Sequence, residues 1–239
     1  MDKKVPRRPE EVEADNYIYG FQMPGNGTKQ CIEEYGDGEK VKVYEELSLR
    51  LNYSGPLYCA DLLSGLIQDR SKALVLDVGA ATGWLGEELH KRGFRKIVAH
   101  DGAQAMLDIC REKNVYSSFI CSIVDEGYKF PEKTDTYDAV TISGAVCENH
   151  LPPSCQIELI RITKPGVGFN SHYIKVYFPR FIIHAYRTTV LNLDYGRAWE
   201  NEAKRLVSEM KWTLYGRLMA PGYSKIVEGY VDIYKVNQR

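Results

Sequence analysis

The stretch Leu76-Asp77-Val78-Gly79-Ala80-Ala81-Thr82-Gly83-Trp84 decides the fold of this 239-residue chain. It follows an apolar run over Ala73–Asp77, typical of a buried parallel strand, and it precedes a helical pattern over Leu85–Arg92. A strand followed by a turn of small residues and then a helix is typical of the sheet edge at which open α/β sheets bind ligands. Glycine adopts positive φ there without penalty, and a ligand can lie against bare backbone.

Strands and helices alternate outward from this turn. Further strands are expected at Lys96–His100, Ser118–Ile123 and Tyr137–Ser143, with helices around Ala103–Lys113, Ser154–Ile162 and Tyr195–Met210. Two β-rich stretches, His172–Phe178 and Phe181–Thr188, stand where one strand is expected, so one of them is interpreted as an insertion. The alternation predicts an α/β fold whose parallel sheet has helices on both faces. Trp212–Met219 and Ile226–Val236 are expected to close the sheet as an antiparallel hairpin.

The first 40 residues differ in composition from the rest of the chain. Residues 1–40 contain several prolines and glycines and dense charge, which predicts a mobile tail followed by a loop or broken helix. From Val41 to Gln68 apolar residues recur at helical spacing, and Gly55-Pro56 splits this run into two helices. We therefore expect residues 41–239 to form one domain with an N-terminal helical cover.

Composition excludes several classes of protein. Hydrophobic residues make up 44% and charged residues 26%, which is typical of a globular protein and not of a disordered one. The 31 basic and 32 acidic residues leave a net charge of −1, so neither nucleic acid nor a membrane surface is expected as a partner. Nothing in the sequence indicates an oligomeric state.

The cysteines and the N-terminus bear on compartment and metal binding. The six cysteines have no CxxC spacing and no accompanying histidine cluster, so no metal site is expected. Neither a secretory signal nor an apolar run of membrane-spanning length is visible, which predicts a soluble cytoplasmic protein with reduced thiols. Without a secretory route, the sequons at Asn26-Gly-Thr28 and Asn52-Tyr-Ser54 are expected to stay unmodified.

The spacing of the glycine turn narrows the choice of ligand. A dinucleotide fingerprint would need glycine at Ala81 and Trp84, and no Gly-Lys-Ser/Thr follows for a phosphate-binding loop. The remaining pattern, acid-x-Gly-x-small-x-Gly, resembles the first motif of the class I S-adenosylmethionine (SAM) methyltransferases, with Ala81 in place of the usual middle glycine. The resemblance implies a Rossmann-like, mostly parallel seven-stranded sheet and SAM as the cofactor. Its amino acid moiety would lie against Asp77, Gly79, Ala80, Ala81, Thr82 and Gly83. An ordinary strand-to-helix turn is the alternative.

A second landmark lies about twenty residues further on, in Ile97-Val-Ala-His-Asp101-Gly-Ala-Gln-Ala-Met106-Leu. A carboxylate at the end of the second strand can accept hydrogen bonds from both ribose hydroxyls. In the family pattern Asp-x-Ser-x-x-Met-Leu, Ala103 replaces the serine, and Met106 would pack on the adenine. The resemblance adds Gly102, Ser122, Ile123 and Ser143 to the cofactor site. The alternatives are that Asp101 only caps a helix and that Met106 only packs in the core.

The resemblance to one subfamily of these enzymes runs from about Tyr44 to Val236. It rests on several further pieces: Tyr137-Asp-Ala-Val140, Ser143-Gly-Ala145, His150-Leu-Pro-Pro153, Glu158–Gly166, Leu193-Asp-Tyr195, Arg205-Leu206 and Trp212. Three departures stand out. The stretch that helps to cover the cofactor, here Tyr44–Asn52, lacks its tryptophan and second tyrosine. Val167 replaces a glycine, and about a dozen residues around Gly168–Arg180 have no counterpart.

Methyl transfer from SAM needs few catalytic side chains, because the methyl donor is already activated. Alignment of the acceptor with the methyl group supplies most of the rate enhancement. A general base is needed only when the acceptor carries a proton. His150, shortly after the fourth strand, is the candidate base, since its ordinary pKa near 6.5 suits proton abstraction. A capping or exposed histidine is the alternative. Tyr186, Arg187 and Tyr195 are expected at the mouth of the site, where they could bind a polar acceptor.

The resemblance implies a SAM-dependent methyltransferase, which we expect to act on a small molecule by in-line transfer. A protein side chain is the second choice of acceptor. The rival hypothesis is a SAM-binding protein that has lost catalysis and works as an interaction or regulatory partner, which Ala81 and the altered cover stretch favour.

Overall fold

The computed structural model of the protein describes residues 27–36, 38–170, 175–178 and 180–238. Most of the tail expected at residues 1–40 lies outside these ranges, as do Asn26 of the first sequon and the first residues of the strand expected at His172–Phe178. Seven strands form one sheet in the order β3-β2-β1-β4-β7-β9-β8. In chain order they are β1 (Leu74–Val78), β2 (Lys96–Asp101), β3 (Ser118–Cys121), β4 (Ala139–Ser143), β7 (Phe181–Arg187), β8 (Trp212–Ala220) and β9 (Gly229–Val236).

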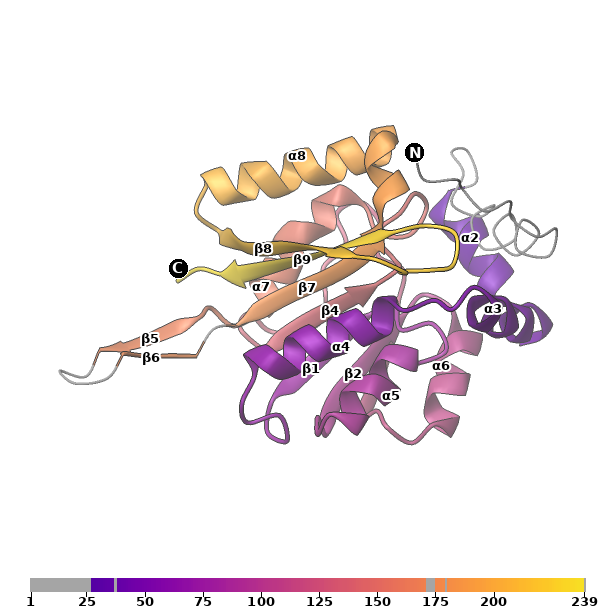
Figure 1. Cartoon of the computed structure of the whole chain (residues 1–239), viewed down its shortest axis with the longest axis horizontal. Helices are drawn as coiled ribbons and strands as arrows, with labels where there is room; N and C mark the ends of the chain where they lie inside the picture. Colours follow the sequence, from indigo (N-terminus) through magenta and orange to yellow (C-terminus); the bar gives the residue numbers. More distant parts are fainter. Residues whose placement is uncertain (1–26, 37, 171–174, 179, 239) are drawn as a thin grey trace.

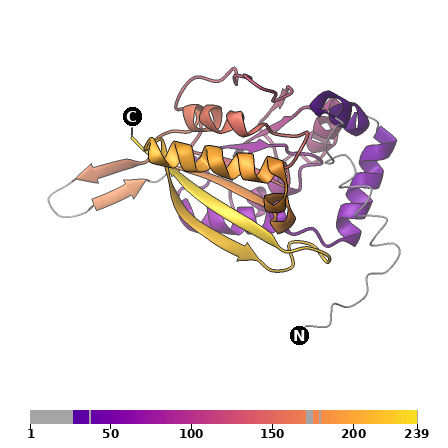
Figure 2. The ribbon, with the colours of Figure 1, turned by 90° about the horizontal axis from the view of Figure 1, so that it is seen from above.

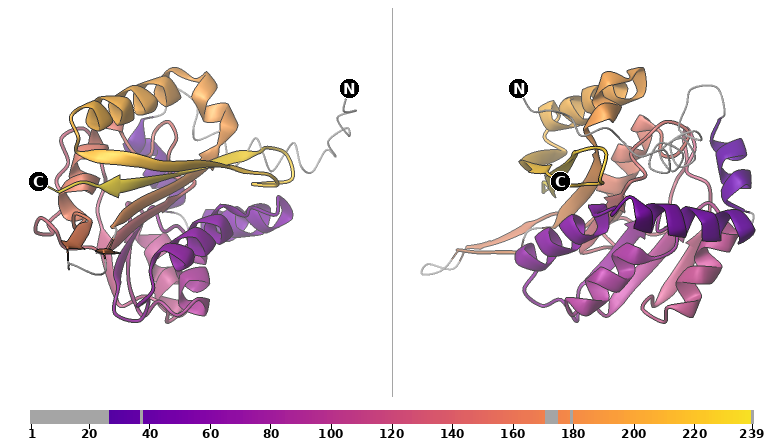
Figure 3. Two further views of the ribbon diagram at one scale, coloured as in Figure 1. Left: turned by 60° about the vertical axis from the view of Figure 1, so that its left-hand side comes forward. Right: turned by 45° about the vertical axis from the view of Figure 1, so that its right-hand side comes forward.

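Helices cover both faces of this sheet (Figure 1). One face carries α4 (Gly55–Leu66), α5 (Trp84–Lys91) and α6 (Gln104–Glu112), and the other carries α7 (Gln156–Ile162) and α8 (Asp194–Ser208). The two layers of helices are also seen on either side of the strands in Figure 3. Two short 3₁₀ helices, η1 (Pro153–Cys155) and η2 (Thr188–Asn192), precede α7 and α8.

The residues of β1 show why the sheet needs cover on both faces. Val75 packs in one cluster with residues of α4 and α5, whereas Leu76 and Val78 pack in another with residues of α7 and α8. Side chains alternate between the faces of a strand, so a strand buried on both sides is apolar almost throughout. Asp77 is the exception in β1, and its side chain is only 1% exposed.

Strand order changes direction at β1. This strand pairs in parallel with β2 on one side and with β4 on the other, so its carboxyl end lies at the topological switch point. The parallel set continues with β7, while β9 runs antiparallel between β7 and β8. The sheet is thus mostly parallel with a C-terminal antiparallel hairpin, which confirms the predicted fold.

The expected insertion forms a separate two-stranded sheet. β5 (Val167–Asn170) pairs antiparallel with β6 (Lys175–Phe178), from Val167 opposite Phe178 to Asn170 opposite Lys175. The pair comes directly before the start of β7, so it lies at the opposite end of the strand from the carboxyl edge. Figures 1 and 2 show it projecting away from the sheet at that end. The described strands of this insertion, β5 and β6, therefore do not form the rim of a site at the carboxyl edge.

Two further helices lie across the carboxyl ends of the parallel strands (Figure 1): α2 (Thr28–Tyr35) and α3 (Gly38–Arg50). We call them the lid helices. The split predicted at Gly55-Pro56 is confirmed, because α3 ends at Arg50 and α4 begins at Gly55. Of the expected loop or broken helix before residue 41, the described residues form helix, in α2 and in the start of α3. Within the described ranges, no helix combines the length and the apolar character needed to cross a membrane.

Candidate functional site

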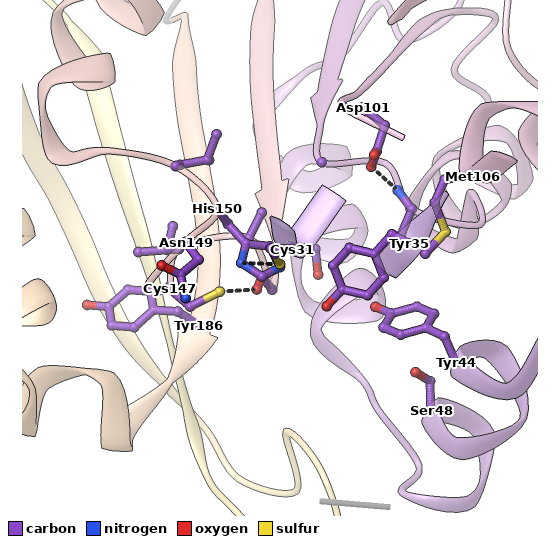
Figure 4. Close-up of a pocket in the computed structure, with 18 of the residues that line it drawn as sticks. Cys31, Tyr35, Tyr44, Ser48, Asp101, Met106, Cys147, Asn149, His150 and Tyr186 are labelled. Carbon is purple, nitrogen blue, oxygen red and sulfur yellow. Dashed lines mark hydrogen bonds between the residues drawn. The ribbon is translucent and has the colours of Figure 1, made fainter. Parts of the chain in front are cut away.

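A pocket opens at the carboxyl ends of the parallel strands, beneath the lid helices (Figure 4). Its walls and open mouth, with the solvent between them, span about 1130 Å³. We call it the central pocket. A side pocket of about 360 Å³ adjoins it and shares the lining residues Tyr44, Ser48, Tyr53, Gly79, Ala81 and Ser143.

Two sets of residues face each other across the central pocket. The turn half comes from the glycine turn, the ends of β2 and β3 and the first turn of α6, and comprises Gly79, Ala81, His100, Asp101, Gly102, Met106 and Ser122. The loop half comes from α2, the loop after β4 and the end of β7, and comprises Cys31, Tyr35, Cys147, Asn149, His150, Leu151, Tyr186, Arg187 and Val190. The structure thus brings most of the predicted site residues together around one cavity. The side pocket adds Asp77, Ala80 and Thr82, whereas Gly83, Ile123 and Tyr195 line neither pocket.

The glycine turn has the backbone that the motif predicts. Gly79 and Gly83 have φ of +69° and +88°, and Ala81 also adopts positive φ, at +47°. The backbone N–H groups of Gly79 and Ala80 both donate to the carbonyl of His100, at 2.8 and 2.9 Å, which fixes the turn against β2. A Cβ on Gly79 would lie 2.7 Å from the Cβ of Ala145, so this position requires bare backbone. Ala81 adopts the left-handed conformation despite its methyl group, which costs about 1–2 kcal/mol relative to glycine.

Asp77 lies on the floor of the side pocket. Tyr116 donates its hydroxyl proton to the Asp77 carboxylate at 2.8 Å, and the same hydroxyl oxygen accepts the Gly86 N–H at 3.1 Å. Burial raises the pKa of Asp77 to about 7, and the negative charge of Asp101 adds to the shift. A positively charged ligand group in the side pocket would stabilise the Asp77 carboxylate and lower this pKa. Nothing in the sequence pattern pointed to Tyr116.

Asp101 connects the turn to the start of α6. Its two carboxylate oxygens accept the N–H groups of Ala81 and Ala103, each at 2.9 Å. Burial raises the pKa of Asp101, and the hydrogen bonds from the backbone oppose the rise. The carboxylate also lines the central pocket and faces the lid helices (Figure 4). It therefore has a local backbone role and is also available to a ligand.

Met106, Gly102 and Ser122 line the pocket beyond Asp101. Met106 is 2% exposed, so it packs in the core and borders the cavity at once. A Cβ on Gly102 would lie 2.6 Å from Cδ1 of Ile32 and 3.7 Å from Cγ1 of Ile123. A flat ligand group bound here would contact both the backbone of Gly102 and the side chain of the lid residue Ile32. Ile123 supports the glycine without reaching the pocket.

Aromatic side chains from outside the stretch Tyr44–Asn52 cover the side pocket. That stretch itself lacks the tryptophan and second tyrosine of the family pattern. The Tyr53 hydroxyl is 2.7 Å from the Ser143 hydroxyl, and the Tyr53 ring stacks on Trp84 with centroids 6.5 Å apart. Trp84 donates its indole N–H to Glu45 of α3 at 3.1 Å, which ties a lid helix to the start of α5. In the sequence Trp84 counted only as a departure from the dinucleotide pattern, so its role in the cover was missed.

His150 reaches the loop half of the central pocket. Its Nδ1 is 3.0 Å from the carbonyl oxygen of Glu148. A carbonyl only accepts, so Nδ1 carries the proton and the lone pair is on Nε2. Cys31 Sγ lies 3.9 Å from both ring nitrogens, and Tyr35 meets the ring edge-on. Burial lowers the pKa of His150, and the positive charge of Arg187 lowers it further. The neutral imidazole can therefore accept a proton at neutral pH.

The predicted acceptor residues divide into two groups. Arg187 lines the pocket at the end of β7, and Tyr186 offers its ring, because its hydroxyl donates to Asp232 at 2.9 Å. Tyr195 is 8% exposed and donates its hydroxyl to the carbonyl of Leu151 at 2.8 Å. It thus positions the loop after β4 from behind. Burial raises the pKa of the Cys147 thiol well above its usual range, so the thiol stays protonated and is a poor nucleophile.

Comparison with known proteins shows what the fold and the motif are similar to. Residues 75–166 match the family model of a methyltransferase domain. Human methyltransferase-like protein 27, which represents the subfamily that Tyr44–Val236 resembles, is 30% identical over 171 residues, covering 71% of this chain and 63% of that protein. The demethylmenaquinone methyltransferase of Thermobifida fusca is 30% identical over 125 residues, 52% of either chain. The chain therefore spans less than two thirds of the length of either relative.

Solved structures show the same similarity at the level of the fold. A chain of the Haloferax volcanii complex between a methyltransferase and the Trm112 methyltransferase activator has a TM-score of 0.62 at 13% identity, over 87% of this chain and 98% of that chain. A SAM-dependent methyltransferase from Aquifex aeolicus has a TM-score of 0.55 at 18% identity, over 84% and 98%. These findings confirm the resemblance and the fold predicted from the sequence, and the family and fold imply SAM as the cofactor.

Proposed function

We propose that this chain is a class I SAM-dependent methyltransferase that transfers the methyl group of SAM to a small-molecule acceptor in the central pocket; the match of residues 75–166 to a methyltransferase domain supports this. One observation carries the proposal. Two buried carboxylates, Asp77 and Asp101, flank a turn of bare backbone, and each has a raised pKa. Such a pair favours a ligand that brings positive charge and hydroxyl donors, and SAM has both.

The residues present fit this cofactor. The side pocket, with Asp77 beneath it, suits a charged amino acid moiety, and the bare backbone at Gly79 allows close approach. Asp101 would accept hydrogen bonds from the ribose hydroxyls, and Met106 would pack on the adenine. The backbone N–H groups that Asp101 already binds hold the carboxylate in place for this role.

SAM when bound supplies a methyl group that its sulfonium already activates. The protein's share is to orient the acceptor and to exclude water. The lid helices cover the pocket, and the Trp84–Glu45 hydrogen bond holds α3 over the turn. If the acceptor is an alcohol, thiol or protonated nitrogen, Nε2 of His150 would take its proton.

The position of the central pocket beneath the lid helices favours a small acceptor. The demethylmenaquinone methyltransferases among the relatives carry the name of a small-molecule acceptor, which supports the same class without identifying the compound. A SAM-binding protein without turnover is the second candidate, because Ala81 places a methyl group on the turn and the cover stretch is altered.

Two measurements test the proposal. Ligand at 100 times its dissociation constant adds about 2.7 kcal/mol, so SAM or its demethylated product should raise the melting temperature by a few degrees. No shift with either compound would contradict cofactor binding. Incubation with isotope-labelled SAM and a metabolite extract should then yield a labelled small molecule by mass spectrometry. A melting shift without any labelled product would favour the second candidate.

A further inference from the structure

Five tyrosine rings line the central pocket, and they come from five separate segments of the chain. The segments are α2, α3, the loop before α4, β7 and the loop after β8, which contribute Tyr35, Tyr44, Tyr53, Tyr186 and Tyr223. Aromatic side chains bury a large apolar area and prefer edge-to-face or offset contacts with other rings. A cavity with this lining is suited to a flat, apolar ligand.

One row of rings leads from the lid helices to His150. The rings of Tyr44 and Tyr35 meet edge-on with their centroids 5.8 Å apart, and Tyr35 meets the His150 ring edge-on at 5.7 Å. Figure 4 shows Tyr35 between the other two rings, with Tyr186 on the opposite side of His150. An aromatic ligand that packs against Tyr35 would therefore lie beside the candidate base.

Hydrogen bonds of the hydroxyl groups hold the other three rings. Tyr186 donates to Asp232 at 2.9 Å, and the Tyr53 hydroxyl is 2.7 Å from that of Ser143. Tyr223 meets Tyr53 edge-on with centroids 5.2 Å apart, and its hydroxyl donates to that of Tyr53 at 3.3 Å. Because these hydroxyls bind protein groups, the rings are oriented before a ligand arrives, which lowers the cost of binding.

The rest of the loop half favours an apolar acceptor over an ammonium ion. Val146, Leu151 and Val190 add aliphatic surface to the tyrosine rings. Tyrosine rings also attract cations, but a cation removed from water needs a carboxylate beside it. Among the described residues that line the pocket, Asp101 is the one carboxylate, and it lies in the turn half.

The candidate base limits the kind of nucleophile. Burial lowers the pKa of His150 below its ordinary value, so the neutral imidazole is a weak base. The pKa of a phenol is about 10, as for tyrosine, whereas that of an aliphatic hydroxyl is about 16, as for water. Proton transfer to His150 is therefore far less unfavourable from a phenol than from an aliphatic alcohol.

We propose that the methyl acceptor is a phenol whose ring packs against Tyr35 and Tyr186 while its hydroxyl faces Nε2 of His150. This rests on the proposed methyltransferase function. Each contact between two rings favours an aromatic ligand over a saturated one by about two- to tenfold. The product is an aryl methyl ether.

The chemical step balances with these groups alone. As the phenol oxygen forms its bond to the methyl carbon, the carbon–sulfur bond of the donor breaks and its electron pair stays on sulfur. The phenol proton passes to Nε2 of His150, and the imidazolium then releases it to water. The tyrosine rings take no part in the exchange and serve only to orient the acceptor.

The test uses matched probes that differ in aromaticity. 4-Propylphenol and 2-naphthol are compared with 4-propylcyclohexanol and 2-decalol, and with 4-propylbenzylamine as a cation, by titration calorimetry on the protein saturated with demethylated cofactor. At least one phenol should bind about fivefold or more tightly than its saturated counterpart and than the benzylamine. With isotope-labelled SAM, that phenol should yield its labelled methyl ether.

Variants separate the ring from the base. Tyr35→Leu should lower the preference for the phenol at least twofold, whereas Tyr35→Phe, which keeps the ring, should retain it. Tyr215→Leu removes a tyrosine that is 62% exposed on β8, and as the control it should retain the full preference. His150→Gln keeps a donor for the Glu148 carbonyl; it should bind the phenol as before but transfer label about 100-fold or more slowly.

The melting shift with cofactor should be unchanged in all four variants. Equal binding of phenols and saturated alcohols, tighter binding of the benzylamine, or no label on a phenol that binds would each overturn the inference while cofactor binding stays intact. A phenol preference unchanged in Tyr35→Leu, or an unchanged rate in His150→Gln, would overturn it as well. Loss of the cofactor shift in the unmodified protein would instead overturn the proposed function.

Discussion

The two halves of the central pocket are built in different ways. The turn half comes almost entirely from one continuous segment, β1 to α6, whose strands, turn and helix follow directly from the sequence pattern. The loop half is assembled from α2, the loop after β4 and the end of β7. Its contacts join distant positions, such as the Gly27 N–H that donates to Asn149 Oδ1 at 3.1 Å across 122 residues.

This difference explains why the family can be inferred from the sequence and the acceptor cannot. Cofactor chemistry needs a fixed local arrangement of carboxylates and bare backbone, which a short motif can encode. The loop half depends on how distant segments pack, and no short pattern describes it. Substitutions in one half should therefore affect the function of that half and leave the other unchanged.

The largest effect is expected for Asp101→Ala. Each ribose hydroxyl bound by the carboxylate would contribute about 1.5–3 kcal/mol, so SAM affinity should fall by at least tenfold. Asp108→Ala, which removes an exposed acid of α6, is the matched control and should leave affinity unchanged. Calorimetric titration with SAM measures both. Equal affinities for the two variants would mean that Asp101 only supports the backbone of the turn.

Asp77→Asn, in the turn half, should raise the stability of the protein at high pH while it lowers the affinity for SAM. The folded pKa of about 7 lies above the ordinary value near 3.9, so the wild-type protein loses stability relative to this variant as pH rises from about 4 to 7. At pH 8, without cofactor, the variant should be more stable by up to about 4 kcal/mol in urea unfolding. Its SAM affinity should fall. Identical stability curves for both proteins across this range would contradict the assigned cost of burying the carboxylate.

Tyr195→Phe tests whether the loop half can be disturbed alone. The change leaves the Leu151 carbonyl without its hydroxyl donor, which should cost about 1–3 kcal/mol of stability. SAM affinity should stay within twofold, because Tyr195 acts only on the loop after β4. Tyr215→Phe is the control: this tyrosine is 62% exposed, and its stability change should stay within 0.5 kcal/mol. A large loss of SAM affinity in Tyr195→Phe would show that the halves are coupled.

The smallest effect is expected for Ala81→Gly. The positive φ of Ala81 costs about 1–2 kcal/mol, whereas glycine adds about 0.4–1 kcal/mol of chain entropy to the unfolded state. The variant should therefore gain between about 0 and 1.6 kcal/mol of stability. Ala203→Gly, inside α8 where φ is helical, should change stability in the opposite direction. A loss of stability in Ala81→Gly would mean that the turn has adapted to alanine.

The fold was predictable because most of its strands and helices have a recognisable pattern within their own stretch of sequence. Apolar runs marked β1, β2 and β4, and glycine or proline marked the ends of the helices. In the turn half, Asp77, Gly79 and Asp101 were found because the motif fixes their spacing. Ile123 was placed in the site by resemblance alone, and the structure shows it one layer behind Gly102.

The residues that sequence reasoning missed act across the fold. Tyr116 reaches Asp77 from the loop before β3, and Trp84 reaches Glu45 of a lid helix. Tyr53 supplies the aromatic cover that the altered stretch before α4 lacks. None of these contacts has a characteristic spacing along the chain. For the same reason Tyr195 was predicted to bind the acceptor, whereas its hydroxyl holds the carbonyl of Leu151.

The central claim is that Asp77 and Asp101 bind SAM from the two sides of the glycine turn. A crystal structure with the demethylated cofactor tests it most directly. The account predicts both ribose hydroxyls within hydrogen-bonding distance of the Asp101 carboxylate, and the amino acid moiety in the side pocket above Asp77. A ligand bound elsewhere, or one whose ribose does not contact Asp101, would contradict it.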